Sequence, residues 1–429
     1  MVFISSGMNG WGGLAPFLHL NNLNHLDKFN HFYKSYRINN EMTGVKMKIG
    51  IVGNYGHDNN GDEAILEGIL TQLREEYGIT ENNIVLFSNH PQNTMSRYNI
   101  ESYFLIKKEG AFIRSVLATL SQHFKEVRKL DVLIMGGGGV LMDMFKRDAP
   151  LYSTLVFLAR VFGCKVIIYG VGAGPIRTFV GKNLIKGMIG ASAITAVRDA
   201  ESKNLLQSIG VDKTIEVIPD PALALGDASL KRRTQKIKRV GVTALPYYSS
   251  AYWPESDEDI YENYINDMAI GLDRAIDEHN VEITFFSTKY PQDIGATKDI
   301  YDKMKRKDSA IILEENLYPQ ELIKLSRDMD FVIGTRLHSL ILSTAAGTPV
   351  IGVGYHPKVH SFMKRIEQLD TYISMEELAD HSAFTRIMKM AGKRWNQVQE
   401  EYITLSSEMK RDTIQSRKLL GKILNNLKK

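Results

Sequence analysis

The chain has 429 residues, of which 44% are hydrophobic and 24% are charged, and its formal net charge is +4. This length allows two domains, and the composition is that of an ordinary globular protein rather than a fibrous or disordered chain. The weak net charge argues against nucleic acid as a partner but is compatible with anionic substrates.

Residues 1–46 show no regular hydrophobic period, and a clear strand pattern begins only after Met47. We therefore expect a poorly ordered N-terminal extension over 1–46 that the fold does not need. Its apolar patch over 14–20 is too short to span a membrane and lacks a basic start, so no signal peptide is predicted. The single cysteine, Cys164, excludes an intramolecular disulfide and favours a cytoplasmic protein.

From Met47 onward, short apolar runs alternate with helical patterns. The strands are expected at 48–53, 84–87, 131–135, 165–170, 193–197 and 216–218. Helices are expected at 62–70, 111–128, 150–162 and from Asp199 to about 207. Alternation of this kind predicts an α/β domain with a doubly wound parallel sheet, which we assign to residues 47–230.

A polar, basic run over 227–236 interrupts the alternation, and we place a linker at 231–238. As a nucleic acid site this run is unconvincing, because it lacks interleaved aromatic residues. A second domain of the same class is predicted over 239–380. Its strands are expected at 239–244, 281–287, 310–313, 330–333 and 349–353, and its helices at 256–279, 294–306, 318–328 and 338–346.

The C-terminal segment 381–429 is predicted to be helical, and its last part is basic and amphipathic. Two interpretations remain open for this tail. It can be a closing helix that packs on a domain, or it can lie on the inner surface of the membrane through anionic lipids.

The most informative stretch is Gly334 to Ser339, which follows a buried strand and begins a helix. Ligands bind at such strand ends in open α/β sheets, and free N–H groups with the helix dipole favour an anion there. Thr335 and Arg336 supply donors, and the Arg fork can grip a carboxylate or phosphate with two bonds. His338 can exchange protons near neutral pH.

Other polar and glycine-rich turns follow the remaining strands. Their candidate ligand-binding residues are Asn54, Asp62, Glu63, Gly136, Gly137, Gly138, Arg198, His356 and Lys358. Because the carboxyl ends of parallel strands share one edge of a sheet, these residues are expected to converge. The sequence contains no dinucleotide fingerprint, no Walker loop and no cluster with zinc-ligand spacing, so we expect no metal and no cofactor.

Taken together, these motifs resemble the polysaccharide pyruvyl transferase family. The resemblance spans residues 47 to 360 and rests on the stretches 53–56, 60–64, 135–138, 170–175, 197–199, 220–222, 334–339, 347–349 and 355–358. Two positions depart from the family pattern, since His57 stands where an aromatic is common and His356 where an acid or another polar residue is common.

The resemblance implies a GT-B-like pair of Rossmann-like domains, with the acceptor on the first and the donor on the second. It implies transfer of pyruvate from phosphoenolpyruvate to two hydroxyls of a sugar in a surface-polysaccharide precursor, which forms a cyclic ketal. Phosphoenolpyruvate is then a substrate, and the acceptor is a lipid-linked or free oligosaccharide. Arg336 and His338 become the expected catalytic residues. The sequence indicates no oligomeric state.

Two alternatives belong to other functional classes. A nucleotide-sugar glycosyltransferase of GT-B fold usually holds the ribose with a glutamate five residues before a glycine, and here that residue is Leu342, counted from Gly347. A non-catalytic sugar-binding or lipid-binding protein of this fold is expected to lack Arg336 or His338, and this chain has both.

Overall fold

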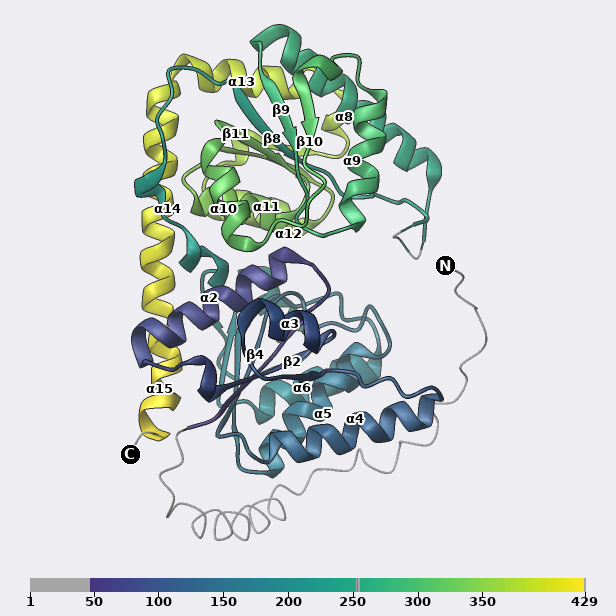
Figure 1. Cartoon of the computed structure of the whole chain (residues 1–429), viewed down its shortest axis with the longest axis vertical. Helices are drawn as coiled ribbons and strands as arrows, with labels where there is room; N and C mark the ends of the chain where they lie inside the picture. Colours follow the sequence, from purple (N-terminus) through teal and green to yellow (C-terminus); the bar gives the residue numbers. More distant parts are fainter. Residues whose placement is uncertain (1–46, 252, 254, 428–429) are drawn as a thin grey trace.

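The computed structural model describes residues 47–251, 253 and 255–427, so the extension expected over 1–46 lies outside the described residues. Two α/β domains lie one above the other, and a long C-terminal helix runs beside both (Figure 1). One sheet has seven strands and the other six, and all their strand pairs are parallel. The predicted fold class is confirmed: two Rossmann-like, doubly wound, GT-B-like domains with a C-terminal helical tail.

The first sheet has the strand order β3-β2-β1-β4-β5-β6-β7. Its strands are β1 (Ile49–Val52), β2 (Ile84–Ser88), β3 (Ser102–Phe104), β4 (Val132–Gly136), β5 (Lys165–Val171), β6 (Ile194–Val197) and β7 (Glu216–Val217). Successive strand residues face opposite sides of the sheet. Accordingly, Ile49 and Ile51 belong to one hydrophobic core and Val52 to the other. Because both faces are buried, the strands are continuous apolar runs.

The helices of the first domain cover both faces of this sheet (Figure 1). Those packed on the core with Ile49 are α2 (Asn60–Tyr77) and α3 (Pro91–Tyr98). Those packed on the core with Val52 are α4 (Phe112–Val127), α5 (Asp148–Val161), α6 (Phe179–Ala191) and α7 (Ala200–Ser208). Connections between parallel strands therefore pass on either side, as a doubly wound sheet requires.

The second sheet has the order β10-β9-β8-β11-β12-β13. Its strands are β8 (Arg239–Thr243), β9 (Glu282–Phe285), β10 (Ala310–Ile312), β11 (Phe331–Gly334), β12 (Val350–Gly354) and β13 (Tyr372–Ser374). Its helices are α8 (Glu258–His279), α9 (Gln292–Lys303), α10 (Pro319–Asp328), α11 (Leu337–Ala345) and α12 (Pro357–Arg365). Short 3₁₀ helices are η3 (Glu81–Asn83), η4 (Pro221–Leu225), η5 (Ala228–Leu230), η6 (Lys307–Ser309), η7 (Leu369–Thr371) and η8 (Glu377–Ala379).

Three helices close the chain, α13 (Ala383–Lys393), α14 (Trp395–Ser416) and α15 (Lys418–Leu427). Helix α14 runs from the second domain back to the first, where α15 ends (Figure 1). Leu420 and Leu424 of α15 are fully buried, and the Tyr77 hydroxyl donates to the carbonyl of Arg417 at 2.7 Å. The tail is therefore a closing helix whose apolar face is used for packing.

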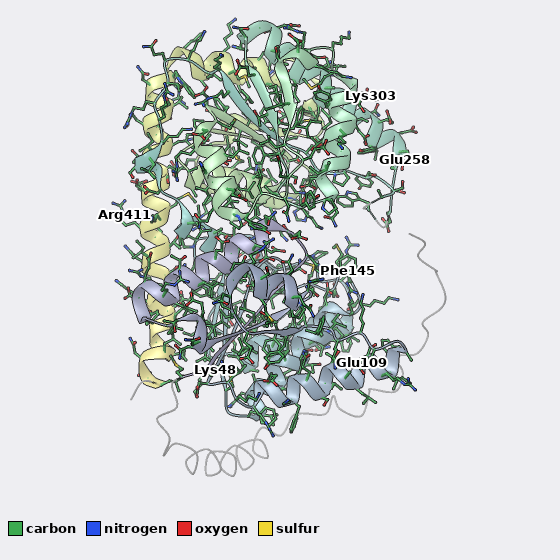
Figure 2. All side chains as sticks on the ribbon, in the orientation of Figure 1. Lys48, Glu109, Phe145, Glu258, Lys303 and Arg411 are labelled. Carbon is green, nitrogen blue, oxygen red and sulfur yellow. The ribbon has the colours of Figure 1, made fainter. Side chains whose placement is uncertain are left out.

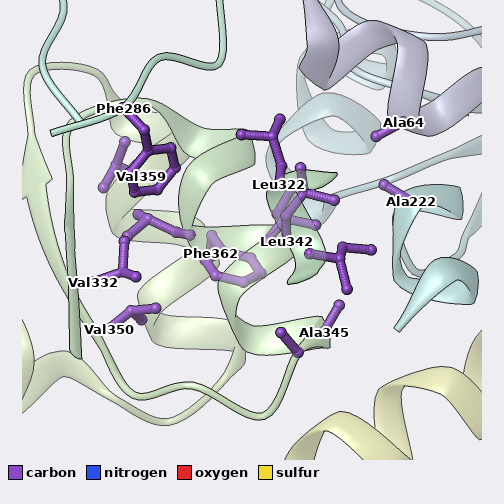
Figure 3. Close-up of a cluster of buried hydrophobic side chains, with 14 of the residues drawn as sticks. Ala64, Ala222, Phe286, Leu322, Val332, Leu342, Ala345, Val350, Val359 and Phe362 are labelled. Carbon is purple, nitrogen blue, oxygen red and sulfur yellow. The ribbon is translucent and has the colours of Figure 1, made fainter. Parts of the chain in front are cut away.

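Charged side chains such as Lys48, Lys303 and Arg411 lie on the outside of the molecule (Figure 2). Between the domains the contact is apolar: Ala64 and Ala222 of the first domain lie in one buried cluster with Leu342 and Ala345 of the second (Figure 3). Gly226 fits against this contact, since a methyl group there would lie 2.3 Å from the carbonyl oxygen of Ala345. The same hydrophobic core thus holds both domains together.

Some elements were not predicted, namely α3, β3, α6, α12 and β13. Helix α6 contains Gly181, Gly187 and Gly190, and each glycine lowers intrinsic helix stability by about 1 kcal/mol. Tertiary packing outweighs this cost, because the ring of Phe157 occupies the space beside Gly187. In the described part of the chain, no helix is both long and apolar enough to cross a membrane.

The run taken for a solvated linker contains a buried charged residue, Lys231. Its ammonium group donates to the carbonyl of Arg327 at 2.9 Å, to the carbonyl of Met329, and to the Thr348 hydroxyl at 2.8 Å. Burial lowers the pKa of Lys231 to about 8. This part of the run is therefore anchored to the second domain by three acceptors, which sequence polarity alone could not reveal.

Candidate active site

The predicted site residues lie at the carboxyl ends of strands, where the two domains meet. Two backbone hydrogen bonds join the domains here. The amide of Asn60 donates to the carbonyl of Thr288 at 2.8 Å, and the amide of Tyr290 donates to the carbonyl of Asp58 at 3.0 Å. The loop after β1 is thus hydrogen-bonded to the loop after β9. Residues from both domains can therefore act on one ligand.

His338 lies in the first turn of α11 and faces the first domain. Its Nε2 is 3.8 Å from Asp220 Oδ2, a distance suited to an ion pair when the imidazole is protonated. This Nε2 is buried and has no hydrogen-bond partner among the described residues. Gly61 of α2 lies against the other side of the ring, where an added methyl group would be 2.2 Å from Nδ1. The imidazole is therefore held between the two domains, and its Nε2 is left without a hydrogen-bond partner among the described residues.

Asp220 and Arg198 form a buried ion pair next to His338. Arg198 donates to Asp220 Oδ2 at 3.2 Å, and its Nε is 3.5 Å from Asp199 Oδ2. Asp220 Oδ1 accepts from the amide of Ala222 at 3.0 Å, which caps η4. Burial by itself would raise the pKa of Asp220, but the contacts with His338 and Arg198 outweigh it and hold that pKa below its ordinary value. Asp220 is therefore an anion that orients two cationic or proton-carrying groups.

Lys358 and His356 lie at the start of α12 in the second domain, across the domain contact from Arg198. His356 caps this helix, because its Nδ1 accepts from the amide of Lys358 at 3.2 Å. Burial, strengthened by the charges of Lys358 and Arg198, lowers the pKa of His356 to about 4, so the ring is neutral at pH 7. Burial and the charge of Arg198 also lower the pKa of Lys358 to about 8. An anion bound here would favour the charged form and raise that pKa again.

A small cavity lies among these groups, with a volume of about 30 Å³. Its polar lining residues are Arg198, Asp199, Asp220, Lys358, Ser361 and Arg365. Space of this size holds about one water molecule. Since the walls come from both domains, a larger anion requires these walls to separate.

Arg336 is the N-cap residue of α11, but its guanidinium pairs with Asp293 of α9 and not with Asp220. Its Nε lies 3.1 Å from Oδ1 of Asp293, and its terminal nitrogen lies 2.5 Å from the same oxygen. Asp293 is fully buried at the start of α9, and burial raises its pKa against the opposing effect of Arg336. The guanidinium is thus fixed from the side of α9, whereas Arg198 and His338 contact Asp220.

Asp62 and Asn54 lie together on the first domain. Asp62 Oδ2 accepts from the side-chain amides of Asn54 at 2.9 Å and Asn59 at 2.7 Å. Glu63 points away from them: its carboxylate accepts from the amide of Gly56 at 2.8 Å and from the Tyr98 hydroxyl at 2.7 Å. Consequently only one of the two adjacent acids faces the site.

The glycine loop after β4 is shaped by its neighbours. Gly137 and Gly138 have φ values of 94° and 65°, which side chains rarely adopt. The Tyr55 ring packs against Gly137, and its hydroxyl donates to the carbonyl of Gly136 at 2.5 Å. Asp62 Oδ1 would lie 2.6 Å from a methyl group at Gly138. The glycines therefore let the backbone approach Asp62 closely.

Thr335 supports the site from within the second domain. Its hydroxyl donates to the carbonyl of Thr243 at 3.1 Å, and its side chain is buried. In the described residues no group of three or more His, Cys, Asp and Glu side chains is arranged to hold a metal ion.

Comparison with known proteins decides the family. The model of the family "Polysaccharide pyruvyl transferase" matches residues 59–357, which is more than half of the chain. The chain belongs to the polysaccharide pyruvyl transferase family. The match includes Arg198, Arg336 and His338, and it ends beside His356, so it spans both domains.

A curated relative and several solved structures are similar to this family member. The amylovoran biosynthesis protein AmsJ of Erwinia amylovora is 23% identical over 427 residues, covering 88% of this chain and 98% of AmsJ. Anabaena HepE, solved with UDP-glucose, has a TM-score of 0.58 at 9% identity and covers 89% of this chain and 100% of its own. UDP-GlcNAc 2-epimerase of Neisseria meningitidis has a TM-score of 0.55 at 14% identity, with the same two coverages of 89% and 100%. At these identities the structures establish the fold alone.

Three acids that contact predicted site residues, Asp199, Asp220 and Asp293, were not predicted as site residues. Asp220 had a usable signal, because Pro219-Asp220-Pro221 directly follows a predicted strand. Asp293 had no such signal, because it lies in the polar first turn of a helix, 43 residues before its partner Arg336. Arg365 also reaches the site, since it donates to the carbonyl of Arg198 at 2.8 Å.

Proposed function

We propose that the protein transfers pyruvate from phosphoenolpyruvate to two hydroxyls of a sugar in a surface-polysaccharide precursor. The products are a cyclic ketal and inorganic phosphate. The observation that carries this proposal is the contact of Arg198 and His338 with the buried Asp220, beside a small cavity that Lys358 also lines, where the two domains meet. Membership in the pyruvyl transferase family and the similarity to an amylovoran biosynthesis protein support an exopolysaccharide precursor as the acceptor.

The donor carries a carboxylate and a phosphate, and the crevice offers cations for both. Arg198 and Lys358 lie close enough for the charge of Arg198 to lower the pKa of Lys358. Although Arg198 is paired with Asp220, its positive charge still repels that of Lys358, and an incoming dianion relieves this repulsion. We assign Arg198 and Lys358 to the phosphate, and Arg336, braced by Asp293, to the carboxylate.

The reaction begins when a proton is delivered to the methylene carbon C3 of the donor, which makes C2 electrophilic. One sugar hydroxyl attacks C2 and loses its proton, and the bond between C2 and the phosphate oxygen breaks. The second hydroxyl then attacks C2 and loses its proton, which closes the ketal. One released proton replaces the one delivered, and the other leaves with phosphate, so the equation balances.

His338 is assigned as the acid that supplies the first proton. Its buried Nε2 has no hydrogen-bond partner in the described part of the chain, and Asp220 lies 3.8 Å away. Positioned charges would also stabilise positive charge on C2 and negative charge on the leaving phosphate.

The acceptor is assigned to the first domain. Asp62 and Asn54 point toward the same crevice from the loop and helix after β1, and Asp62 influences the pKa of Lys358 on the other wall. Carboxylate and amide groups are suited to bind sugar hydroxyls. This places the attacking oxygens between Asp62 and the proposed phosphate position.

The rival function is that of a glycosyltransferase with a nucleotide-sugar donor. It is favoured by the fold, since HepE was solved with UDP-glucose. Against it, Leu342 of α11 is 1% exposed and packs between the domains. Its apolar side chain cannot accept a hydrogen bond from a ribose hydroxyl.

The deciding experiment incubates the protein with phosphoenolpyruvate and extracted lipid-linked oligosaccharides. The expected result is release of phosphate together with the mass gain of one pyruvyl ketal on the oligosaccharide. Thermal unfolding with phosphoenolpyruvate or with UDP-sugars gives a second readout, because a ligand that binds only the native state raises the melting temperature. Stabilisation by a UDP-sugar without any effect of phosphoenolpyruvate would contradict the proposal.

A further inference from the structure

Helix α4 exposes an apolar face where a surface helix usually exposes charge. The exposed fraction is 70% for Ile113 and 61% for Leu117. Other exposed apolar residues of this helix are Phe112, Val116, Leu120 and Phe124. The face turned to the sheet is formed by Thr119, His123 and Val127, which are buried. The spacing of three and four residues places the exposed group along one stripe.

Two further segments expose apolar side chains at the carboxyl ends of neighbouring strands in the first sheet. Met144 and Phe145 are exposed in the loop between β4 and α5, and Phe179 and Val180 are exposed at the start of α6, with Phe179 81% exposed. Asp143 joins these segments, because it accepts from the amides of Arg177 at 2.8 Å and Thr178 at 2.6 Å. The starts of α4, α5 and α6 all lie at the carboxyl ends of parallel strands, so these residues share one rim.

The charges around this rim are mainly positive. The exposed basic side chains next to the apolar residues are Lys108, Arg114, Lys146, Arg147, Arg177 and Lys182. The nearby acids are largely neutralised: Glu109 pairs with Lys107 at 2.7 Å, Asp148 pairs with Arg147 at 3.8 Å, and Asp143 is buried among backbone donors. The other basic residues of the rim form no such ion pair in the described part of the chain. Apolar side chains bordered by unbalanced basic residues are suited to the headgroup region of an anionic lipid bilayer.

We propose that the α4 face, with the rim formed by Met144, Phe145, Phe179 and Val180, docks the protein on an anionic membrane surface. Charge complementarity decides for lipid over a second copy of this chain, because two such faces would bring like basic charges together. The closing helix α15 is not the docking element, since Leu420 and Leu424 are buried against the first domain.

The location of this face relates it to the candidate site. Phe145 and Glu109 lie on the same side of the first domain, and Phe145 lies below the gap between the domains (Figure 2). The loop that carries Phe145 begins directly after the glycine turn at Gly136–Gly139, which touches Asp62. Docking would therefore bring the crevice near the bilayer. The relevance to a lipid-linked acceptor rests on the proposed function, but the docking itself does not.

Sedimentation of the full-length protein with vesicles tests docking without any substrate, so its outcome is separate from that of the transferase assay. The protein should sediment with vesicles of phosphatidylcholine and phosphatidylglycerol, bind less to phosphatidylcholine alone, and be released by high salt. The double variant Ile113→Glu with Leu117→Glu should lower the partition coefficient by about tenfold or more. Both residues are exposed, so the melting temperature should stay near that of the wild type.

Matched controls come from α13 of the second domain, where Met390 and Lys389 are also exposed. Met390→Glu should leave vesicle binding unchanged, and Lys389→Glu should affect it less than Arg114→Glu. Equal binding by wild type and by the Ile113 and Leu117 double variant would overturn the proposal. So would a wild-type dimer in light scattering that the double variant dissociates, because a second copy would then cover the face. A third result would also contradict the proposal: the wild type does not bind vesicles, and residues 1–46 are cleaved by protease faster in the double variant than in the wild type. Residues 1–46 would then be the segment that covers the α4 face.

Discussion

Gly61 of the first domain lies directly against the imidazole of His338 of the second domain, so close that a methyl group on Gly61 would be 2.2 Å from Nδ1. A real side-chain carbon does not approach a ring nitrogen this closely. Glycine at position 61 therefore determines where His338 stands relative to Asp220, whose Oδ2 is 3.8 Å from Nε2. The position of the proposed acid depends on both domains.

Gly61→Ala should displace His338 and lower turnover by about a hundredfold, because a shift of about 1 Å at a reacting group has consequences of that size. Donor affinity should change less, since Arg198 and Lys358 remain in place. The measurement is steady-state turnover at saturating phosphoenolpyruvate. Gly295→Ala in α9 is the matched control: nothing lies within 4 Å of its added methyl group, and it should stabilise the protein by about 0.5–1 kcal/mol. Wild-type turnover in Gly61→Ala would show that this contact does not position the acid.

Strand ends could be predicted from the sequence because buried parallel strands are continuous apolar runs and glycine or polar turns follow them. This was enough to place Arg198, His338 and Lys358 at facing edges. It could not give the partner of Arg336, because Asp293 comes from another strand-to-helix connection. Nor could it give the contact of Gly61 with His338, which depends on how two domains pack. Helical periodicity likewise predicts α4 but does not say which of its faces meets the sheet.

The pair of Arg336 and Asp293 combines a structural role with the proposed donor contact. Arg336→Ala leaves the fully buried Asp293 carboxylate without its main partner, which should lower the free energy of unfolding by about 3–5 kcal/mol. The double variant Arg336→Met with Asp293→Leu removes both charges and should recover most of this loss. Urea unfolding followed by circular dichroism measures both effects.

Donor affinity separates the two roles of this pair. The same double variant should still bind phosphoenolpyruvate about ten- to a hundredfold more weakly than wild type, because a charge-assisted contact is missing. Arg336→Lys should also bind weakly, since a point charge does not reproduce the guanidinium fork. If the stable double variant bound the donor as tightly as wild type, Arg336 would be structural only, and the donor carboxylate would have to be held elsewhere.

The lowered pKa of Lys358 predicts that donor binding depends on pH. Burial lowers its pKa to about 8 in the free protein, and a bound phosphate favours the charged form. Above that pH the free protein has lost the proton that the complex retains, so binding takes up one proton and affinity should fall by up to about tenfold per pH unit. Below about pH 8 this group should cause no change. Titration calorimetry in buffers of different ionisation enthalpy measures the proton uptake directly.

Two variants on α12 test the assignment to Lys358. Lys358→Gln should weaken donor binding at pH 7 and remove the decline above about pH 8, because no group with that pKa remains. Lys364→Gln, an exposed neighbour on the same helix, should keep both the affinity and the decline. A decline that persists unchanged in Lys358→Gln would assign it to another residue.

His338 should act as a proton donor as well as a contact. Its Nε2 is buried without a hydrogen-bond partner among the described residues, next to the anionic Asp220. Removing a general acid typically lowers turnover by a factor on the order of a hundred to ten thousand. We therefore expect His338→Ala and His338→Gln to lose turnover to this extent while donor affinity changes by much less.

Asp220 supplies a second test of the same role, because it should act through His338. Asp220→Asn keeps the shape of the side chain but removes the charge 3.8 Å from Nε2 of His338, so turnover should fall while the donor dissociation constant changes by much less. Asp199→Asn is the matched control, since Asp199 also lies beside Arg198, at 3.5 Å from its Nε, whereas in the described structure His338 pairs with Asp220 and not with Asp199. Turnover and donor dissociation constants are to be measured for all four variants across pH. If the His338 variants lose affinity while turnover at saturation persists, His338 is a phosphate ligand, and the acid must be sought elsewhere in the crevice.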